Sequence, residues 1–251
     1  MIVRTAEELA GLKRVGQLVA RTLDVMERLV APGVTTAELD QAAEAYAVAE
    51  GAQSSPRMTY NFPGFTCISV NEQVVHGVPG PRVIEPGDIV KIDVTLYLDG
   101  FLGDSARSVL VTPVSDAVTR LHAAALEAFD AGCAAAQVGN RVRDVGAAVG
   151  AVAAAHGLQV LRQLSGHGIG RKLHEPPDVP NWDDPDATMV LRDGMVFALE
   201  PMFSVSDPTV VDEKDGWTVR TRRRSLAIHH EHTIMVRAGQ LPLILTAAAL
   251  Q

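Results

Sequence analysis

The chain has 251 residues, of which 47% are apolar and 21% are charged, a balance typical of a folded globular protein and not of a disordered one. Acidic residues outnumber basic ones by 30 to 22, and the net charge of −8 argues against a general nucleic-acid binder. Two cysteines, Cys67 and Cys133, are too few for a disulfide framework. No signal peptide is visible, and the longest nearly uncharged stretch, 145–161, is short and weakly apolar, so we expect a soluble, cytoplasmic protein without a membrane span.

The first 50 residues predict two helices. Apolar residues recur at spacings of three and four over residues 9–30, and a Pro-Gly pair at 32–33 ends this helix. Thr35, with Glu38 three residues later, is typical of a helix N-cap and predicts a second helix that runs to about Glu50.

The same layout returns 106 residues further along the chain. Residues 11–53 aligned on residues 117–159 give nine identities in 43 positions, four of which are alanines in an alanine-rich chain. Two unrelated amphipathic helix pairs could give such a match, but the helix-ending glycines also coincide, and each marks a backbone position. We therefore predict a single domain over residues 1–251, built from two pseudo-equivalent halves at about 11–111 and 117–236.

After each helix pair the hydrophobic period changes from 3.6 to 2, which predicts strands. The expected strands are 67–75, 89–98 and 101–111 in the first half, and 195–205, 217–221 and 228–236 in the second. Long helices beside antiparallel strands indicate an α+β fold in which helices cover one face of the sheet.

Asp99-Gly100 lies between two alternating runs and predicts a two-residue hairpin turn. Thr95 then faces Asp104, and Asp93 becomes a diagonal neighbour of Asp104 on the same face. Aspartate is uncommon in strands, and two like charges at this range repel each other unless a cation or a shared proton intervenes. The pair lies either on a solvated face or in a metal site, and we favour the metal site.

Three further residues offer metal-binding chemistry. His167 lies between two glycines, which would let the backbone approach a ligand closely, although the motif alone also fits a core or loop histidine. Glu200 and Glu231 lie in apolar runs, where an unpaired carboxylate would be costly. Four carboxylates and one imidazole suit two divalent ions such as Mn²⁺, Fe²⁺ or Co²⁺, and Zn²⁺ is not excluded.

Six motifs, in order and spread over nearly the whole chain, resemble those of the type I methionine aminopeptidases in their short bacterial form. These motifs are Asn71-Glu-Gln-Val-Val-His76-Gly, Lys91-Ile-Asp93-Val-Thr, Gly103-Asp104-Ser, Gly166-His167-Gly-Ile-Gly, Leu199-Glu200-Pro-Met and Glu231-His-Thr. The resemblance implies the pita-bread fold, whose internal pseudo-twofold agrees with the repeat. It also implies that Asp104 and Glu231 bridge two metal ions, whose full ligand set is Asp93, Asp104, His167, Glu200 and Glu231.

The resemblance further implies a role for each remaining motif residue. Glu200 would be the general base, and His76 and His174 would contact the substrate. The apolar S1 pocket for the methionine side chain would include Phe62, Cys67 and Trp217. Read alone, His76 also fits a strand-end histidine, and Cys67 a small buried hydrophobe.

The chain departs from the family pattern at three places near these residues, and none of the departures removes a ligand. Thr59-Tyr60 replaces the usual Gly-Tyr, and Leu173 replaces a common phenylalanine. His229 stands where glutamine is common, which removes an amide near the metal ligands.

The activity implied is removal of the N-terminal methionine from nascent proteins whose second residue is small. A proline-specific aminopeptidase or prolidase shares the fold and the ligands but usually carries a large N-terminal domain, and a non-catalytic pita-bread binding protein would have lost ligands. We expect a monomer that acts on the N-termini of nascent polypeptides and binds neither DNA nor a membrane. The basic run Arg220, Arg222, Arg223 and Arg224 is either a solvated strand face and turn or a transient contact with ribosomal RNA.

Overall fold

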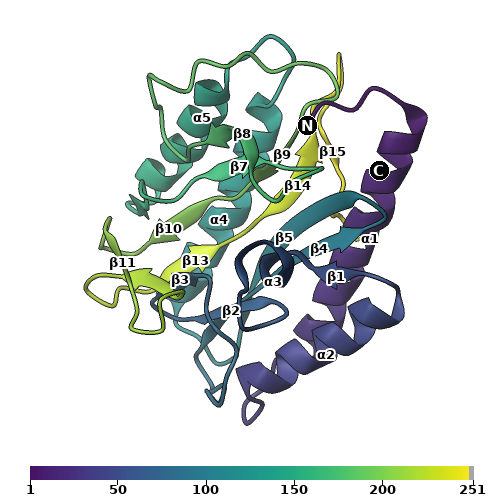
Figure 1. Cartoon of the computed structure of the whole chain (residues 1–251). Helices are drawn as coiled ribbons and strands as arrows, with labels where there is room; N and C mark the ends of the chain where they lie inside the picture. Colours follow the sequence, from purple (N-terminus) through teal and green to yellow (C-terminus); the bar gives the residue numbers. More distant parts are fainter. Residues whose placement is uncertain (249–251) are drawn as a thin grey trace.

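The computed structural model describes residues 1–248, in which each of two long helix pairs is followed by antiparallel strands (Figure 1). The helices are α1 (Ala6–Leu29), α2 (Thr36–Ala49), α3 (Ser55–Tyr60), α4 (Asp116–Ala135) and α5 (Val142–Ala155). The strands of the first half are β1 (Gln53–Ser54), β2 (Cys67–Val70), β3 (Gln73–Val75), β4 (Ile89–Leu98) and β5 (Phe101–Leu110). Those of the second half are β6 (Gln159–Val160), β7 (Gly166–Gly168), β8 (Glu175–Val179), β9 (Val196–Leu199), β10 (Met202–Ser204), β11 (Val210–Asp212), β12 (Val219–Thr221), β13 (Ala227–His229), β14 (His232–Met235) and β15 (Leu243–Ile244).

The two predicted N-terminal helices are α1 and α2. At the start of α2 the Thr35 side chain accepts from the Glu38 N–H, while the Glu38 carboxylate accepts from the Thr35 N–H at 2.7 Å. This reciprocal capping box satisfies two backbone donors that the helix itself leaves unpaired.

The second helix pair repeats the first at the offset found in the sequence. α1 and α4 end at Leu29 and Ala135, and α2 and α5 each span 14 residues that begin at Thr36 and Val142. The glycines after the helices also match, since Gly33 and Gly139 have φ of 93° and 96°. These shared boundaries support two related halves; the division of the chain at 11–111 and 117–236 stays a prediction.

The hairpin of β4 and β5 has the predicted register. Thr95 pairs with Asp104, and Asp93 pairs with Ala106. Asp99 and Gly100 both have positive φ, 51° and 85°, as a two-residue turn of this type requires. β4 pairs with β1 and β2 as well, so the hairpin is the centre of the first-half sheet.

Three of the predicted strands are wrong as continuous elements. The run 67–75 is broken between β2 and β3 by Asn71, whose φ is 56°. The run 195–205 is broken between β9 and β10, where Pro201 lacks the N–H that a ladder needs. The run 228–236 is broken between β13 and β14 at Glu231. A fourth run, 217–221, starts its strand two residues late, at Val219.

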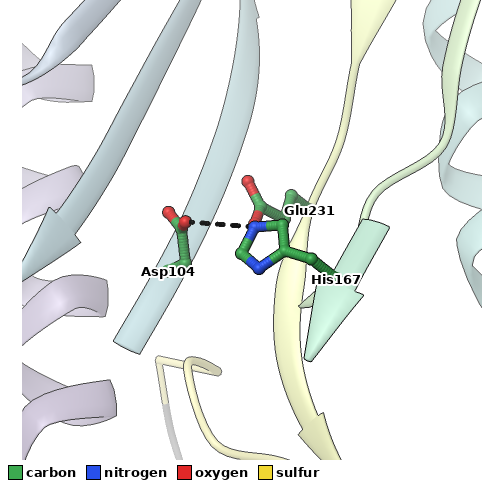
Figure 2. A group of neighbouring side chains, drawn as sticks. All are labelled: Asp104, His167 and Glu231. Carbon is green, nitrogen blue, oxygen red and sulfur yellow. Dashed lines mark ion pairs between the residues drawn. The ribbon is translucent and has the colours of Figure 1, made fainter. Parts of the chain in front are cut away.

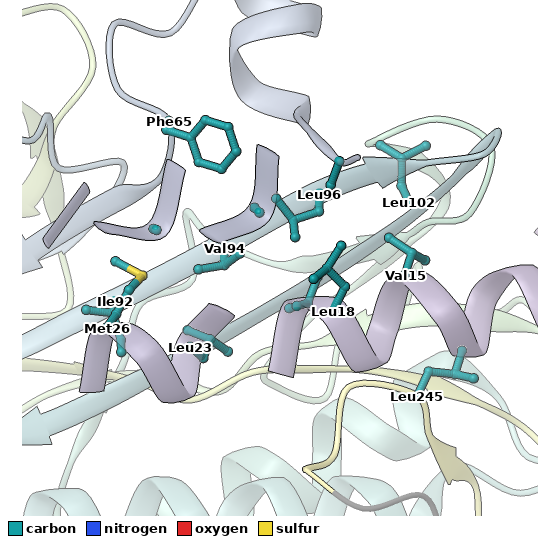
Figure 3. Close-up of a cluster of buried hydrophobic side chains, with 14 of the residues drawn as sticks. Val15, Leu18, Leu23, Met26, Phe65, Ile92, Val94, Leu96, Leu102 and Leu245 are labelled. Atoms are coloured by element: carbon teal, nitrogen blue, oxygen red, sulfur yellow. The ribbon is translucent and has the colours of Figure 1, made fainter. Parts of the chain in front are cut away.

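Each helix pair packs against the strands of its own half. Residues of α1 and α2 form one buried apolar cluster with β2, β4 and β5, part of which Figure 3 shows around Leu18, Met26 and Ile92. Residues of α4 and α5 form a second cluster with β9 and β14. Each helix pair thereby supports the strands of its own half (Figure 1).

No helix among residues 1–248 has the length and apolar character that crossing a bilayer would need.

Candidate active site

The two aspartates of the hairpin lie side by side on one face of β4 and β5. Asp104 is buried, and its Oδ1 accepts a hydrogen bond of 2.8 Å from the Thr95 hydroxyl directly across the ladder. The carboxyl group of Asp93 adjoins that of Asp104. The predicted diagonal pair of carboxylates is therefore present, and both residues line one cavity.

The strand β5 joins the two halves beside these aspartates. Ala106 and Glu231 exchange backbone hydrogen bonds of 3.0 and 3.3 Å. The Thr233 hydroxyl accepts from the Asp104 N–H and donates to the Asp104 carbonyl. These bonds fix Glu231, at the break between β13 and β14, beside Asp104, as Figure 2 shows.

Glu200 and Glu231 occupy breaks in two neighbouring strands. β9 pairs with β14, and β10 pairs with β13, so the break at Glu200 lies opposite the break at Glu231. The His230 N–H bonds to the Pro201 carbonyl, and the Asn181 amide donates to the Glu200 carbonyl at 2.9 Å. Because the two strand breaks lie opposite each other, the side chains of both glutamates reach the same cavity.

His167 faces the carboxylates from β7. Its Nε2 lies 3.9 Å from Asp104 Oδ2 and 3.7 Å from Glu200 Oε1. Its Nδ1–H donates to the Gly168 carbonyl at 3.1 Å, which leaves the Nε2 lone pair free for a metal. His167, Asp104 and Glu231 offer ligand atoms that all lie within 4.8 Å of one another (Figure 2).

The glycines that flank His167 have a different role from the predicted one. A Cβ on Gly166 would lie 2.4 Å from the Ala198 carbonyl, and one on Gly168 would lie 2.3 Å from the Pro176 carbonyl. The two glycines thus allow β7 to approach the backbones of the neighbouring strands β9 and β8 closely. Glycine sets the position of His167 by allowing three strands to pack closely.

Burial and mutual repulsion give the site acids raised pKa values. Burial raises the pKa of Asp104 to about 7, and burial together with Asp104 raises the pKa of Asp93 well above its usual range. Burial and the neighbouring carboxyls do the same for Glu200 and Glu231. Burial also lowers the pKa of His167 to about 4, so its imidazole is neutral. Such a group of acids ionises fully only when a cation compensates the charge.

The donor set fits divalent metal ions. Glu231 Oε1 has no hydrogen-bond partner among the described residues, although it is buried. A divalent ion would provide the missing partner for this buried carboxylate oxygen, which lies among other oxygen and imidazole donors.

His174 and His76 lie at the rim of the same cavity. The ring centroid of His174 is 4.2 Å from that of His167, and its Nδ1 is hydrogen-bonded to Tyr60 Oη at 2.6 Å. His174 directly precedes β8. His76 follows β3 in the left-handed region, with φ of 55°.

The three predicted pocket residues line the same cavity. The rings of Phe62 and Trp217 meet edge to face, with centroids 5.3 Å apart. Cys67 is buried and pairs with Asp93 across β2 and β4. All ten predicted site residues therefore line one cavity of about 290 Å³.

A buried lysine supports two of the segments that carry the site. Lys91 is 1% exposed, and its Nζ donates to the Asn71 and Ala227 carbonyls at 2.9 and 3.1 Å. Burial, with a smaller effect of Arg82, lowers the pKa of Lys91 to about 7.

Two cavity residues had no role in the sequence-based prediction. Tyr60 bonds to His174, which lies 114 residues further along the chain, so only the fold could reveal the contact. His229 is buried at the end of β13, with its Nε2 at 3.6 Å from Glu200 Oε2 and 3.5 Å from Glu231 Oε2. The departure from the family pattern at His229 was visible in the sequence, but its orientation was not.

Comparison with known proteins shows which family the chain belongs to. The family model of metallopeptidase family M24 matches residues 10–238. The chain is 39% identical over 248 residues to methionine aminopeptidase 2 of Bacillus subtilis, covering 98% of this chain and 99% of that one. It is 39% identical over 236 residues to the methionine aminopeptidase of Clostridium perfringens, covering 94% and 95%. The chain belongs to the methionine aminopeptidases of metallopeptidase family M24.

Solved structures of this family have the same fold. The crystal structure of methionine aminopeptidase from Rickettsia prowazekii is 35% identical, with a TM-score of 0.93 and coverage of 98% of this chain and 100% of that one. The Thermotoga maritima structure is 33% identical, with a TM-score of 0.94 and coverage of 98% and 99%. The predicted α+β pita-bread fold and the predicted family are confirmed.

The prolidase alternative is less well supported. The prolidase from Pyrococcus furiosus has a TM-score of 0.80 but is only 20% identical, and the match covers 66% of that longer chain. This similarity extends to the fold alone.

Proposed function

We propose that the protein is a metal-dependent methionine aminopeptidase that removes the N-terminal methionine from polypeptides whose second residue is small. The observation that supports this most is the convergence of all ten predicted site residues on one cavity. The names of the curated relatives agree with it.

In this proposal two divalent ions, Co²⁺, Mn²⁺, Fe²⁺ or Zn²⁺, would be held by the carboxylates of Asp93, Asp104, Glu200 and Glu231 and by the imidazole of His167. When bound, such ions act as Lewis acids toward a carbonyl and lower the pKa of water toward neutrality. The raised pKa values of the acids agree with a site built to be neutralised by cations.

Glu200 is the general base in this proposal and accepts the proton of the attacking water. Its position at a strand break, with its backbone carbonyl held by Asn181, fixes the carboxylate in the cavity. His174 and His76, at the rim, contact the carbonyl of the scissile bond. The hydrogen bond between Tyr60 Oη and His174 Nδ1 holds the His174 ring in one orientation.

The apolar end of the cavity selects the first residue of the substrate. Phe62, Cys67 and Trp217 offer an aromatic and sulfur-lined slot that suits an unbranched thioether. The second residue of the substrate passes beside His174, where elements from both halves of the chain meet. A small second residue is therefore preferred.

A panel of four peptides tests this specificity under one metal condition. We expect fast release of the first residue from Met-Ala, slow release from Met-Phe and Leu-Ala, and almost none from Leu-Pro. Preference for Leu-Pro over Met-Ala would favour a proline-specific enzyme instead.

Four finer predictions concern the substrate source, the assembly state, the location and the partners of the enzyme. Action on nascent polypeptides, a monomeric state and a cytoplasmic location stay predictions. So does a ribosome contact through the basic run, in which Arg220 and Arg224 are already paired with Glu213 and Glu72. The positive charge left for RNA then lies mainly on the exposed Arg222 and Arg223.

A further inference from the structure

The ring of His229 is buried beside Glu200 and Glu231, and no residue that the structure describes forms a hydrogen bond with it. The side chain is 2% exposed, and neither Nδ1 nor Nε2 has a hydrogen-bond partner within residues 1–248. A buried imidazole normally pairs at least one nitrogen, because leaving both unpaired forfeits the hydration that each nitrogen had in water. The ring therefore points to a ligand that the protein itself does not supply.

The distances from His229 match ligands that share one ion. Its Nε2 is 3.6 Å from Glu200 Oε2 and 3.5 Å from Glu231 Oε2, too far for a good hydrogen bond. Two ligand atoms about 2.1 Å from one ion at tetrahedral angles lie about 3.4 Å apart. The three residues thus form a second group whose ligand atoms all lie within 4.8 Å of one another.

Glu200 lies between two imidazoles that face different oxygens. His167 Nε2 approaches Oε1 at 3.7 Å, and His229 Nε2 approaches Oε2 at 3.6 Å. The first imidazole is among the ligands that the family resemblance implies, whereas the second replaces a residue that is commonly glutamine. The two sides of the Glu200 carboxylate are therefore similar, since each faces one imidazole nitrogen.

We propose that His229 is a direct nitrogen ligand of one of the two ions, in a donor set with Glu200 and Glu231. The inference rests on the proposed function, since it concerns the same ions. A second imidazole makes the site less purely oxygen-rich and shifts its preference from Mn²⁺ toward Zn²⁺, Fe²⁺ or Co²⁺. His230, the next residue, is the matched control because its ring packs edge to face on Phe129, at a centroid distance of 5.3 Å.

The test uses the full chain with Zn²⁺ as the probe. In ¹⁵N-histidine-labelled wild-type protein, we expect two imidazoles to show the ¹⁵N shift of metal coordination when Zn²⁺ is added. His229→Gln should remove one of these signals, and His230→Gln should leave both. In calorimetric titrations with chelator competition, His229→Ala should weaken one binding event by at least about 10-fold, since loss of a residue that only supports a ligand already costs 10- to 100-fold.

The outcomes separate this inference from the proposed function. If wild-type protein binds metal and releases methionine, yet the His229 nitrogens do not shift and both His229 variants bind Zn²⁺ like the wild type, then the inference alone is overturned. A change in kcat with unaltered metal affinity and unaltered ¹⁵N shifts would also overturn it, because that pattern belongs to a positioning residue. If the wild-type protein neither binds metal nor cleaves Met-Ala, both the inference and the proposed function fail.

Discussion

Replacing Gly168 by alanine tests how the fold positions the candidate metal site. Gly168 directly follows His167 on β7, and a Cβ there would lie 2.3 Å from the Pro176 carbonyl and 2.5 Å from the Glu175 carbonyl. Ordinary contacts of a Cβ atom begin at 3.4 Å, so β7 and β8 must move apart by about 1 Å. His167 lies on the first of these strands, and His174 directly precedes the second.

Two magnitudes follow from that displacement. Inserting a methyl group into a tightly packed region costs about 1–3 kcal/mol, and for a protein of this size each kcal/mol lowers the Tm by about 2–4 °C. A misplacement of about 1 Å in an active site costs about 100-fold in rate. We therefore expect Gly168→Ala to lower the Tm by several degrees and kcat/KM for Met-Ala by about 100-fold.

Gly80→Ala is the control for this substitution. A Cβ on Gly80 would meet only the Val78 carbonyl, at 4.0 Å, which is an ordinary contact. Thermal unfolding and Met-Ala cleavage are measured for both variants with the same metal. Equal Tm and equal kcat/KM for the two variants would refute the argument that close strand packing positions His167.

The remaining predictions concern two buried charged side chains. Glu200→Gln should stay folded by circular dichroism and lose about 10²–10⁴-fold in kcat, as expected when a general base is removed; near-wild-type kcat would remove Glu200 from that role. Burial lowers the pKa of Lys91 from 10.5 to about 7, so between these values the unfolded chain binds more protons and the folded state becomes more stable as the pH rises. Urea unfolding with a chelator present should show a gain of about 2 kcal/mol from this group between pH 7 and 9, and Lys91→Met should lose that gain. An unchanged pH dependence in Lys91→Met would contradict the assignment.

The parts of the site that the sequence predicted well depend on local rules. Asp99-Gly100 defines the turn, and the turn defines the register, so the pairing of Thr95 with Asp104 follows without any long-range information. The start of α2 was predictable because Thr35 and Glu38 form a capping box within four residues.

The parts that the sequence missed depend on contacts between distant segments. The break at Glu231 falls inside what looks like one continuous apolar strand in the sequence, and its place opposite the break at Glu200 follows only from the strand pairing. The break at Glu200 did carry a sequence signal, because Pro201 cannot donate to a ladder. The bond between Tyr60 and His174 requires the packing of α3 against the start of β8. The orientation of His229 depends on the pairing of β13 with β10.

The most direct test of metal-dependent methionine removal is a titration of metal-free protein. The chain is stripped with a chelator, the residual metal is measured by mass spectrometry, and methionine release from Met-Ala is followed as Mn²⁺, Fe²⁺ or Co²⁺ is added. The raised pKa values and the unpaired buried Glu231 oxygen predict no turnover without metal. Activity should then rise with bound metal and level off when the site is filled. Full turnover in protein shown to be free of metal would contradict the account.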